Sequence, residues 1–355
     1  MNWVHRALIG ALAFSSLALC RFPVQGAKGA ERPIGVVDLH VDLSYQINYK
    51  NKDLVAGSGQ YLASELLRSG VEGVVLPLYI PRDVAREGPR LADLERSYQA
   101  MVSALAKTQP YQLPGCSLPA RVRTWFSFEG SAPFADPAAD LNQWLQRGTA
   151  LFGLVHTYDN ALATSAGKTA NPPPLKAGLT AKGRSFVQRL LERRAVVDVS
   201  HASDATAREV IALAQQVQVP VVASHSNARA LANHARNLSD DLLQGIARTG
   251  GVVGINFHSP FLIRTGGEAT LSDVVKHVRY VVNKVGVEHV AIGSDFEGDI
   301  NAARELHDVR GFPKLAQALE ASGLSNQDVR KIMGLNALRV LCGNGAGTPQ
   351  CVSAQ

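Results

Sequence analysis

Short apolar runs alternate with longer amphipathic segments along most of this chain. The apolar runs are rich in Val, Ile, Leu and Phe, and the segments between them carry apolar residues at helical spacing. Runs that are apolar throughout are typical of strands buried on both faces of a parallel sheet. We expect eight such strands, over residues 36–43, 73–79, 122–130, 150–156, 195–201, 219–225, 251–258 and 289–297.

Helices are predicted between these strands. Apolar spacing and capping residues place them over residues 61–68, 91–107, 140–146, 180–194, 204–216, 239–248, 270–285 and 325–341. Eight alternating strand and helix units favour an α/β fold of the closed (β/α)8 TIM-type barrel class, the architecture of many metal-dependent hydrolases, over an open doubly wound sheet. The sequence has no Rossmann fingerprint in the right place and no Walker loop, so nothing in it supports nucleotide binding.

Six of the eight predicted strands end in His, Asp or Glu. A single histidine at a strand end is usually a hydrogen-bonded core or rim residue, but six strands that end alike are hard to explain in that way. Active sites of such barrels lie at the carboxyl ends of the strands. We therefore expect one cavity to be lined by His40, Asp42, Glu129, His156, His201, His225 and Asp295.

These side chains are typical metal ligands. Charge gathered in one cavity is costly unless a cation neutralises it. The set contains too many ligands for one tetrahedral zinc, and it suits two metals about 3.5–4 Å apart that share a bridging carboxylate and a bridging hydroxide. The histidine content favours zinc over magnesium or calcium. The sequence thus predicts a binuclear site with two Zn2+ per chain.

Composition and charge add little to this picture. The chain has 355 residues, of which 46% are hydrophobic and 19% charged, which is ordinary for a globular protein. Its net charge is +6, without a basic run dense enough for a nucleic-acid partner, and no stretch after the N-terminal region is long and apolar enough for a transmembrane helix. We expect one barrel domain over residues 27–355, with a short tail from about residue 342.

The N-terminal region has the features of a secretory signal. Arg6 gives a positive start, residues 7–19 form an apolar stretch too short to span a bilayer, and short residues precede a cut after Gly26. Residues 1–26 are therefore predicted to be a signal peptide, and the protein to be exported to the periplasm or secreted. A second interpretation is a lipoprotein signal with Cys20 as the lipid anchor, although Leu19 is larger than the usual residue there.

Cysteine spacing agrees with export. Cys342 and Cys351 bracket a glycine-rich segment that could close a disulfide in an oxidising compartment. The alternative is two unpaired thiols near the end of the chain. With that bridge formed, Cys116 would remain free.

A set of short motifs resembles a known family in order and spacing. The motifs are Asp38–Leu43, Ser127–Gly130, Leu154–His156 with Asp159–Asn160, Asp198–His201, Ser224–Ser226, Ala235–Leu238, Gly293–Gly298 and Gly334–Val340. Together they span roughly residues 34–341 and resemble the membrane dipeptidase (renal dipeptidase) family of binuclear zinc peptidases, within the amidohydrolase-like barrels. Two departures stand out: Leu39 and Val41 replace a Gly and an Asn of the first motif, and His258 follows Asn256-Phe257 where relatives often have an aromatic residue.

The resemblance implies which residues hold the metals. His40 and Asp42 would hold one zinc, His201 and His225 would hold the other, and Glu129 would bridge both. These are the residue types that coordinate zinc in proteins.

The resemblance also implies how the substrate is bound and cleaved. Asp295 would act as the general base beside the bridging water, and His156 would hydrogen-bond the carbonyl oxygen as charge develops on it. Arg236 would bind the terminal carboxylate of the substrate, a role for which the sequence alone does not prefer it to Arg229. An arginine fork matches a carboxylate in a bidentate way.

The function expected from the resemblance is hydrolysis of the one peptide bond of a dipeptide, including dipeptides with a D-residue at the carboxyl side. A homodimer is expected on the same ground. An enzymatic alternative is a binuclear amidohydrolase acting on N-acyl amino acids or β-lactams. A non-enzymatic alternative is a barrel that binds a small peptide or a structural metal. The departure at His258 indicates that the substrate side of the pocket differs from that of relatives.

Overall fold

The computed structural model describes residues 34–54, 59–84, 88, 90–112, 122–167, 178–264 and 266–343. The predicted signal peptide, Cys20, Cys116 and Cys351 lie outside the described residues, as do residues 168–177 between the fourth and fifth predicted strands. The bridge between Cys342 and Cys351 therefore stays a prediction. No helix within the described part of the chain combines the length and the apolar character that crossing a bilayer requires.

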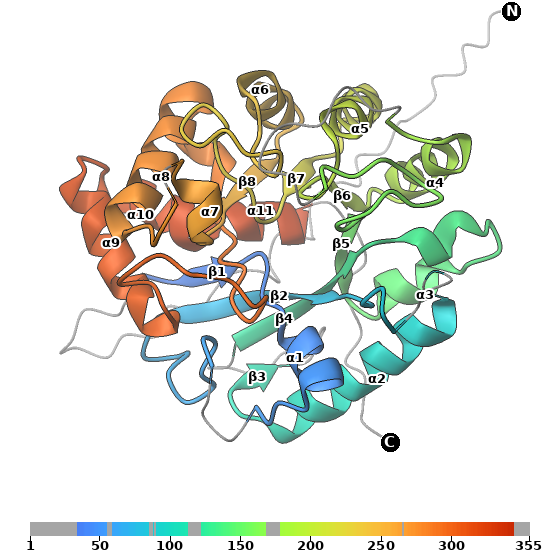
Figure 1. Cartoon of the computed structure of the whole chain (residues 1–355), viewed down its shortest axis with the longest axis horizontal. Helices are drawn as coiled ribbons and strands as arrows, with labels where there is room; N and C mark the ends of the chain where they lie inside the picture. Colours follow the sequence, from blue (N-terminus) through green and yellow to red (C-terminus); the bar gives the residue numbers. More distant parts are fainter. Residues whose placement is uncertain are drawn as a thin grey trace, which may run out of the picture.

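Eight parallel strands close into a barrel, which confirms the predicted fold class (Figure 1). They are β1 (Val36–Asp38), β2 (Val71–Leu78), β4 (Val122–Glu129), β5 (Thr149–Gly153), β6 (Val196–Asp198), β7 (Val221–Ala223), β8 (Val252–Ile255) and β9 (Val290–Ile292). Each strand pairs with its neighbours in chain order, and the β1–β9 pairing joins the two ends of the sheet. A further two-residue strand, β3 (Tyr111–Gln112), pairs with the start of β4.

Helices surround the strands in Figure 1. They are α1 (Leu43–Lys50), α2 (Leu91–Lys107), α3 (Leu141–Gln146), α4 (Ala181–Glu192), α5 (Asp204–Val217), α6 (Asp240–Arg248), α7 (Ser259–Leu262), α8 (Leu271–Val285), α9 (Phe312–Ala321), α10 (Asn326–Arg330) and α11 (Asn336–Gly343). Short 3₁₀ turns occur at η1 (Ala132–Ala135), η2 (Val287–His289) and η3 (Val309–Gly311), and a π-helical turn, η4 (Lys331–Leu335), joins α10 to α11.

Helix starts follow the capping residues seen in the sequence. Thr180 accepts a hydrogen bond from the amide of Gly183 at 3.0 Å, and Thr270 forms a capping box with Asp273. Ser239 begins α6 without such a bond, because its hydroxyl donates to Asp241 instead. The capping residues therefore locate most helix starts, although the cap itself is not always formed.

The predicted helix over residues 61–68 is wrong. This segment forms a series of turns, in which the amides of Glu65 and Gly70 reach only three residues back. Leu66 is fully buried while Leu67 is 50% exposed, so the apolar residues do not form one helical face. A helix this short does not recover the cost of nucleation without an apolar face that packs.

The barrel interior is a compact apolar cluster that includes the C-terminal helix. Strand residues contribute Val37, Leu39, Val75, Trp125, Leu151, Val196, Val222, Val252 and Ala291, and α11 adds Ala337, Leu338 and Val340. The larger apolar cluster lies between the strands and the surrounding helices. The side chains inside the barrel therefore form a packed core, and the polar residues that follow the strands lie beyond it.

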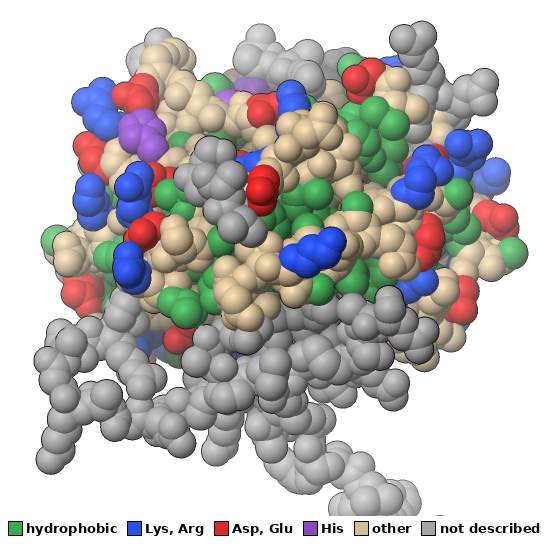
Figure 2. Space-filling model, turned by 90° about the horizontal axis from the view of Figure 1, so that it is seen from below, with side chains coloured by type: hydrophobic (Ala, Val, Ile, Leu, Met, Phe, Trp, Pro, Cys, Tyr) green, Lys and Arg blue, Asp and Glu red, His purple; other side chains and the backbone are tan. Residues whose placement is uncertain are grey.

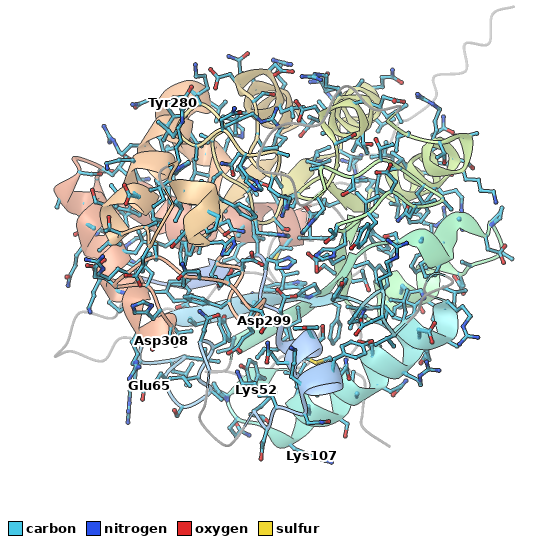
Figure 3. The ribbon with its side chains drawn as sticks, viewed as in Figure 1. Lys52, Glu65, Lys107, Tyr280, Asp299 and Asp308 are labelled. Carbon is cyan, nitrogen blue, oxygen red and sulfur yellow. The ribbon has the colours of Figure 1, made fainter. Side chains whose placement is uncertain are left out.

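Charge is spread over the outside of the molecule. On the face drawn in Figure 2, basic and acidic side chains are interspersed with apolar ones. Figure 3 shows Lys107 and Tyr280 at the periphery, whereas Asp299 lies closer to the centre of the ring of helices. Asp299 lines a cavity in this central region, and that cavity contains the candidate site.

Candidate active site

A cavity of about 600 Å3 opens at the carboxyl ends of the strands. Its lining residues include Asp42, Tyr45, Tyr79, Asp83, Glu129, His156, His201, His234, Arg236, His258, Phe261, Asp295, Asp299 and Ile300. His40 and His225, each only 1% exposed, approach the same carboxylate of Glu129 from within the protein. All seven strand-end residues predicted from the sequence are therefore brought together.

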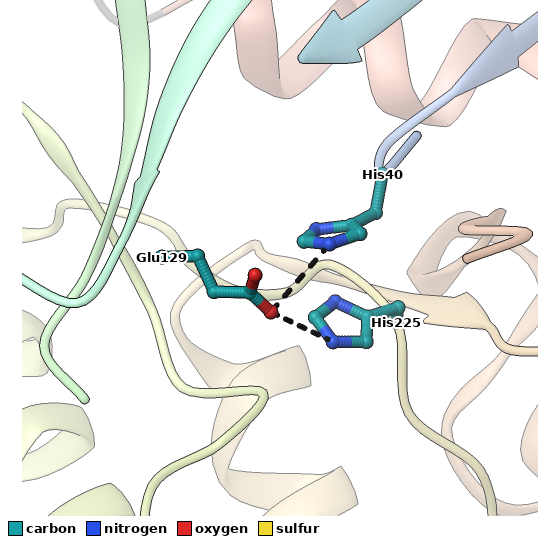
Figure 4. A group of neighbouring side chains, drawn as sticks. All are labelled: His40, Glu129 and His225. Carbon is teal, nitrogen blue, oxygen red and sulfur yellow. Dashed lines mark ion pairs between the residues drawn. The ribbon is translucent and has the colours of Figure 1, made fainter. Parts of the chain in front are cut away.

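Glu129 lies at the centre of the group. Its Oε1 atom is 3.6 Å from His40 Nε2 and 3.7 Å from His225 Nε2, as Figure 4 shows. The same oxygen is 2.9 Å from His201 Nε2 and 3.7 Å from His156 Nε2. One carboxylate thus faces four imidazole nitrogens, which is the geometry expected of a bridging ligand.

The groups that could hold a metal overlap. One consists of His40, Glu129 and His225, and a second of Glu129, His156 and His201. The third joins His40 to Asp42 and Asp295, with His40 Nε2 at 3.5 Å from Asp42 Oδ2 and 4.0 Å from Asp295 Oδ1. Glu129 and His40 each belong to two groups, so the residues suit two neighbouring ions better than one.

Burial governs the electrostatics of these groups. It raises the pKa of Glu129 to about 8 and that of Asp295 to about 7, because the charged carboxylates lose hydration. Burial alone would lower the pKa of His40, but Asp42, Glu129 and Asp295 together raise it to about 10. Acidic groups this close need a positive charge among them.

The other two histidines favour the form that binds metals. Burial lowers the pKa of His201 and of His225 well below the usual value, so both rings are neutral near pH 7. Their Nε2 atoms lie 3.0 Å apart and face Glu129. In addition, the buried Nε2 atom of His40 has no hydrogen-bond partner among the described residues. Together, these nitrogen atoms fit a divalent cation such as zinc.

Residues behind the histidines hold the rings in place. The hydroxyl of Ser224 donates to Asp198 Oδ2 at 2.5 Å and lies 2.8 Å from His225 Nδ1. On β1, Asp38 accepts hydrogen bonds from the amide and hydroxyl of Ser294 at 2.9 Å and 2.5 Å. Asp38 and Asp198 were not predicted from the sequence as supporting residues. Their positions, two residues before His40 and three residues before His201, were a visible signal.

Asp295 is fixed in an uncommon backbone conformation. Its φ angle is +66°, and Asn256 donates a hydrogen bond to its Oδ2 atom at 2.9 Å. Gly298 follows closely, and a Cβ atom there would lie 2.6 Å from Asp42 Oδ2 and 3.1 Å from Asp295 Oδ1. Only glycine lets the loop pass so near both carboxylates, so the loop holds Asp295 beside the candidate metal ligands.

The structure distinguishes the two candidate arginines. Arg229 makes a two-pronged ion pair with Asp204, at 2.7 and 2.6 Å, and is therefore occupied. Arg236 is 5% exposed and lines the cavity, where its Nη1 atom donates to the carbonyl of Ser200. Its Nη2 atom has no partner within the described part of the chain. A buried cation with an unused donor is a ready site for a carboxylate.

A family model and several known proteins match this chain. The model of the membrane dipeptidase family (peptidase family M19) matches residues 26–344. The chain is 35% identical to dipeptidase aclJ of Aspergillus oryzae over 224 residues, which are 63% of this chain and 52% of that protein. It is 36% identical to an uncharacterised protein encoded in the pqqA 5′ region of Klebsiella pneumoniae, over 60% of this chain and 79% of that protein. The match thus spans about half the length of the Aspergillus relative.

Solved structures support the fold. A crystal structure of a family M19 dipeptidase superposes with a TM-score of 0.78 at 24% identity, over 89% of this chain and all of that one (100%). A metallopeptidase of Rhodobacter sphaeroides, bound to a phosphinate mimic of L-Ala-D-Ala, superposes with a TM-score of 0.75 at 24% identity, over 87% of this chain and 99% of that one. The family match covers all the described residues, including every residue of the site. This chain therefore belongs to peptidase family M19, the membrane dipeptidase family.

Proposed function

We propose that this protein is a binuclear zinc dipeptidase that hydrolyses the single peptide bond of a dipeptide, including dipeptides with a D-residue at the carboxyl side. The observation that carries the proposal is the cavity itself. Overlapping groups of metal-ligating side chains surround Glu129 in this cavity. The buried Arg236 also lines it, and its Nη2 atom has no hydrogen-bond partner among the described residues. Membership of family M19 supports the same activity.

The proposed ligands divide into two sets. His40 and Asp42 would hold one zinc, His201 and His225 the other, and Glu129 would bridge them. Zinc held in this way would lower the pKa of a bound water to about 7 and polarise a carbonyl group. His156 is as near to Glu129 as His225 is, both at 3.7 Å, so it could contribute a metal ligand as well as contact the substrate.

The remaining residues would carry the proton and the charge. Asp295 would take a proton from the attacking water and return it to the nitrogen of the leaving amine as the C–N bond breaks. His156 would donate a hydrogen bond to the carbonyl oxygen, where negative charge develops. A donor placed in advance at that position contributes a few kcal/mol to the stability of the transition state.

Arg236 would set the length of the substrate. Because it is buried at a fixed position in the cavity, a carboxylate bound to it fixes the distance to the scissile bond. A dipeptide has its free carboxylate one residue beyond that bond, whereas the carboxylate of a longer peptide lies farther away. This role of Arg236 would explain a preference for dipeptides over proteins.

The first test combines metal analysis with hydrolysis. We expect two zinc ions per chain, and cleavage of L-Ala-L-Ala and L-Ala-D-Ala that chelation abolishes and added zinc restores. The amide of the same dipeptide should be a poor substrate, because Arg236 would lack its partner. Cleavage of N-acetylalanine without dipeptide cleavage would favour the amidohydrolase alternative, and bound zinc without any hydrolysis would favour a binding protein.

A variant of the proposed base tests the mechanism. Asp295→Asn should retain both zinc ions and lower kcat by about 10²–10⁴-fold, which is the usual contribution of a general base. Metal content and kcat of the same preparation check both points. A variant with full zinc and unchanged kcat would show that Asp295 is not the base.

Export and self-association belong to the same proposal. We propose that residues 1–26 direct export to the periplasm or the medium, by cleavage after Gly26 or by a lipid on Cys20, and that the mature chain forms a homodimer. The mass of the N-terminal peptide from cell fractions distinguishes the two routes. Sedimentation of the purified protein gives the oligomeric state.

A further inference from the structure

Two histidines and a phenylalanine form one wall of the cavity beside Arg236. His234 and His258 both line the cavity, and their ring centroids lie 4.5 Å and 4.8 Å from that of Phe261. Pro260 lines the cavity as well. We call His234, His258 and Phe261 the histidine wall. Neither histidine belongs to the candidate metal groups, so the mechanism proposed above does not use them.

Both histidines present a hydrogen-bond donor to the cavity. The Nδ1 atom of His234 accepts from the amide of Arg236 at 3.1 Å, and that of His258 accepts from the amide of Asn301 at 3.0 Å. A ring nitrogen that accepts a hydrogen bond carries no proton, so in the neutral ring the proton is on Nε2. Among the described residues, the hydrogen bonds of both rings are made through Nδ1 and none through Nε2, and both side chains are only partly buried.

The rings are neutral at physiological pH. Burial, together with the charge of Arg236, lowers the pKa of both His234 and His258 to about 4. The histidine wall thus offers two uncharged N–H donors next to an apolar ring. It differs from the metal end of the cavity, where the histidines face carboxylates.

Arg236 lies between the candidate metal ligands and the histidine wall. Its charge lowers the pKa of His201 and His225 at the metal end and also that of His234 and His258 in the wall. Its guanidinium carbon is 5.5 Å from the centroid of the Phe261 ring. A substrate whose carboxylate binds Arg236 would therefore place its carboxyl-terminal side chain near the histidine wall, and its scissile bond near Glu129.

We propose that the histidine wall binds the side chain of the carboxyl-terminal residue and selects side chains that carry a hydrogen-bond acceptor, the class formed by Glu, Gln, Asp and Asn. The inference rests on the proposed dipeptidase function and names its substrate class. Phe261 packs against the methylene groups of such a side chain, and the two Nε2–H groups donate to its terminal oxygen. An apolar side chain leaves both donors without a partner, which costs free energy on binding.

The test compares three dipeptides that differ only at the carboxyl-terminal side chain. The zinc-loaded wild-type enzyme is assayed with Ala-Glu, Ala-Gln and Ala-Leu, each with an L- or a D-residue at the carboxyl end. We expect kcat/KM for the Glu and Gln peptides to exceed that for the Leu peptide at least tenfold in the preferred configuration. Equal values for the three side chains would overturn the inference while leaving the dipeptidase function intact.

Substitutions of His258 assign the effect to the wall. His258→Phe keeps an aromatic ring and removes the donor, so the ratio of the Glu or Gln peptide to the Leu peptide should fall about tenfold. His258→Gln keeps a donor near the position of Nε2 and should restore most of the ratio. His307→Phe, at a 61% exposed side chain away from the cavity, is the matched control and should keep the wild-type ratio.

Two other outcomes are decisive. A loss by the same factor for all three peptides in His258→Phe would place His258 at the shared carboxylate and overturn the inference. If no dipeptide is cleaved, the proposed function fails, and calorimetric binding of the same peptides decides the subsite. Tighter binding of the Glu or Gln peptide that is lost in His258→Phe would support the subsite, and equal binding would refute it.

Discussion

Ser224 and Ser226 lie two positions apart, but their hydroxyl groups have different surroundings. Ser224 Oγ bridges Asp198 and the ring of His225, at 2.5 and 2.8 Å. Ser226 Oγ is buried without a hydrogen-bond partner within the described residues. The first hydroxyl orients a proposed zinc ligand, whereas the second forms no hydrogen bond with these groups.

We therefore expect Ser224→Ala to weaken zinc binding about 10–100-fold, the usual effect of removing a partner of a metal-bound histidine. Ser226→Ala is the matched control and should leave the zinc affinity nearly unchanged. Competition with a chromogenic chelator measures both dissociation constants. Equal effects of the two substitutions would refute the orienting role of Ser224.

His277 couples stability to pH away from the site. It is 1% exposed, its Nδ1 atom accepts from the amide of Ala228, and its Nε2 atom donates to the carbonyl of Leu262. Burial lowers its pKa from 6.5 to about 4. The neutral ring contributes its full stabilisation above pH 6.5, and this is lost as the pH falls towards 4, because the unfolded chain takes up the proton first.

The difference in unfolding free energy between wild type and His277→Gln should therefore shrink between pH 7.5 and pH 4, by up to about 3 kcal/mol. Denaturant titrations of both proteins at several pH values give this difference directly, and effects of pH on other groups cancel in it. A difference that does not change with pH would contradict the assignment.

At the scale of elements, the apolar pattern located every barrel strand but made most of them too long. Leu154 and Val155 were predicted to lie in a strand, yet they follow β5 (Thr149–Gly153) and are 1% and 2% exposed. Val199 likewise was predicted to lie in a strand, but it follows β6 (Val196–Asp198) and is 1% exposed. An apolar run indicates that its residues are buried, and not that they pair in a sheet. Here the chain stays buried beyond the last paired residue, so the predicted strands were too long. Four of the proposed ligands accordingly lie just beyond a strand (His40, Asp42, His201 and His225), whereas Glu129 is the last residue of β4.

Helices α1 and α9 were missed for different reasons. Only Leu43 and Ser44 are buried in α1, so its sequence carries little amphipathic signal. In α9, by contrast, Phe312, Leu315, Ala316 and Leu319 are buried at helical spacing. The second helix could have been predicted from the sequence, whereas the first depends on contacts with distant residues.

The site was predictable as far as its residues follow strands. Metal-ligand types after successive strands pointed to one cavity, and the motifs assigned Arg236. The contacts that hold the site were not predictable, because they join distant parts of the chain: Ser294 to Asp38 is a separation of 256 residues. The ion pair of Lys52 and Glu297 likewise joins residues that are far apart in the sequence.

The loop after β9 is held by a buried ion pair. Lys52 Nζ is 2.5 Å from Glu297 Oε2, and the two side chains are 11% and 5% exposed. The other oxygen of Glu297 accepts from the amides of Gln60 and Tyr61 at 2.8 and 2.7 Å. Glu297 also has a positive φ angle of 71°, like Asp295 two residues before it. The pair therefore holds the loop that carries the proposed base.

Glu297→Gln should lower the free energy of unfolding by about 3 kcal/mol, because it leaves the Lys52 charge buried without its partner. The double variant with Lys52→Met should recover part of this loss, and the cycle of four proteins gives the coupling. Asp299→Asn, which breaks the exposed contact with Lys50, is the control and should have a far smaller effect. Additive losses would exclude a coupled pair.

For the whole molecule, the C-terminal helix completes the barrel core. Leu338 of α11 is 6% exposed and packs in the apolar cluster inside the barrel, which also contains Trp125. Leu335, at the end of the preceding π turn, is 48% exposed. The two leucines are three residues apart. Replacing each by alanine therefore compares the same substitution inside and outside the core.

Leu338→Ala should lower the free energy of unfolding by about 2–5 kcal/mol, because it leaves a cavity among residues from several strands. Leu335→Ala should change it by no more than about 0.5 kcal/mol. Unfolding is followed both by tryptophan fluorescence, to which Trp125 inside the barrel and Trp144 in the outer apolar cluster contribute, and by far-ultraviolet circular dichroism. Because α11 contacts β1, β8 and β9, both signals should shift together in Leu338→Ala. A shift in only one signal would mean that the helix unfolds independently of the barrel.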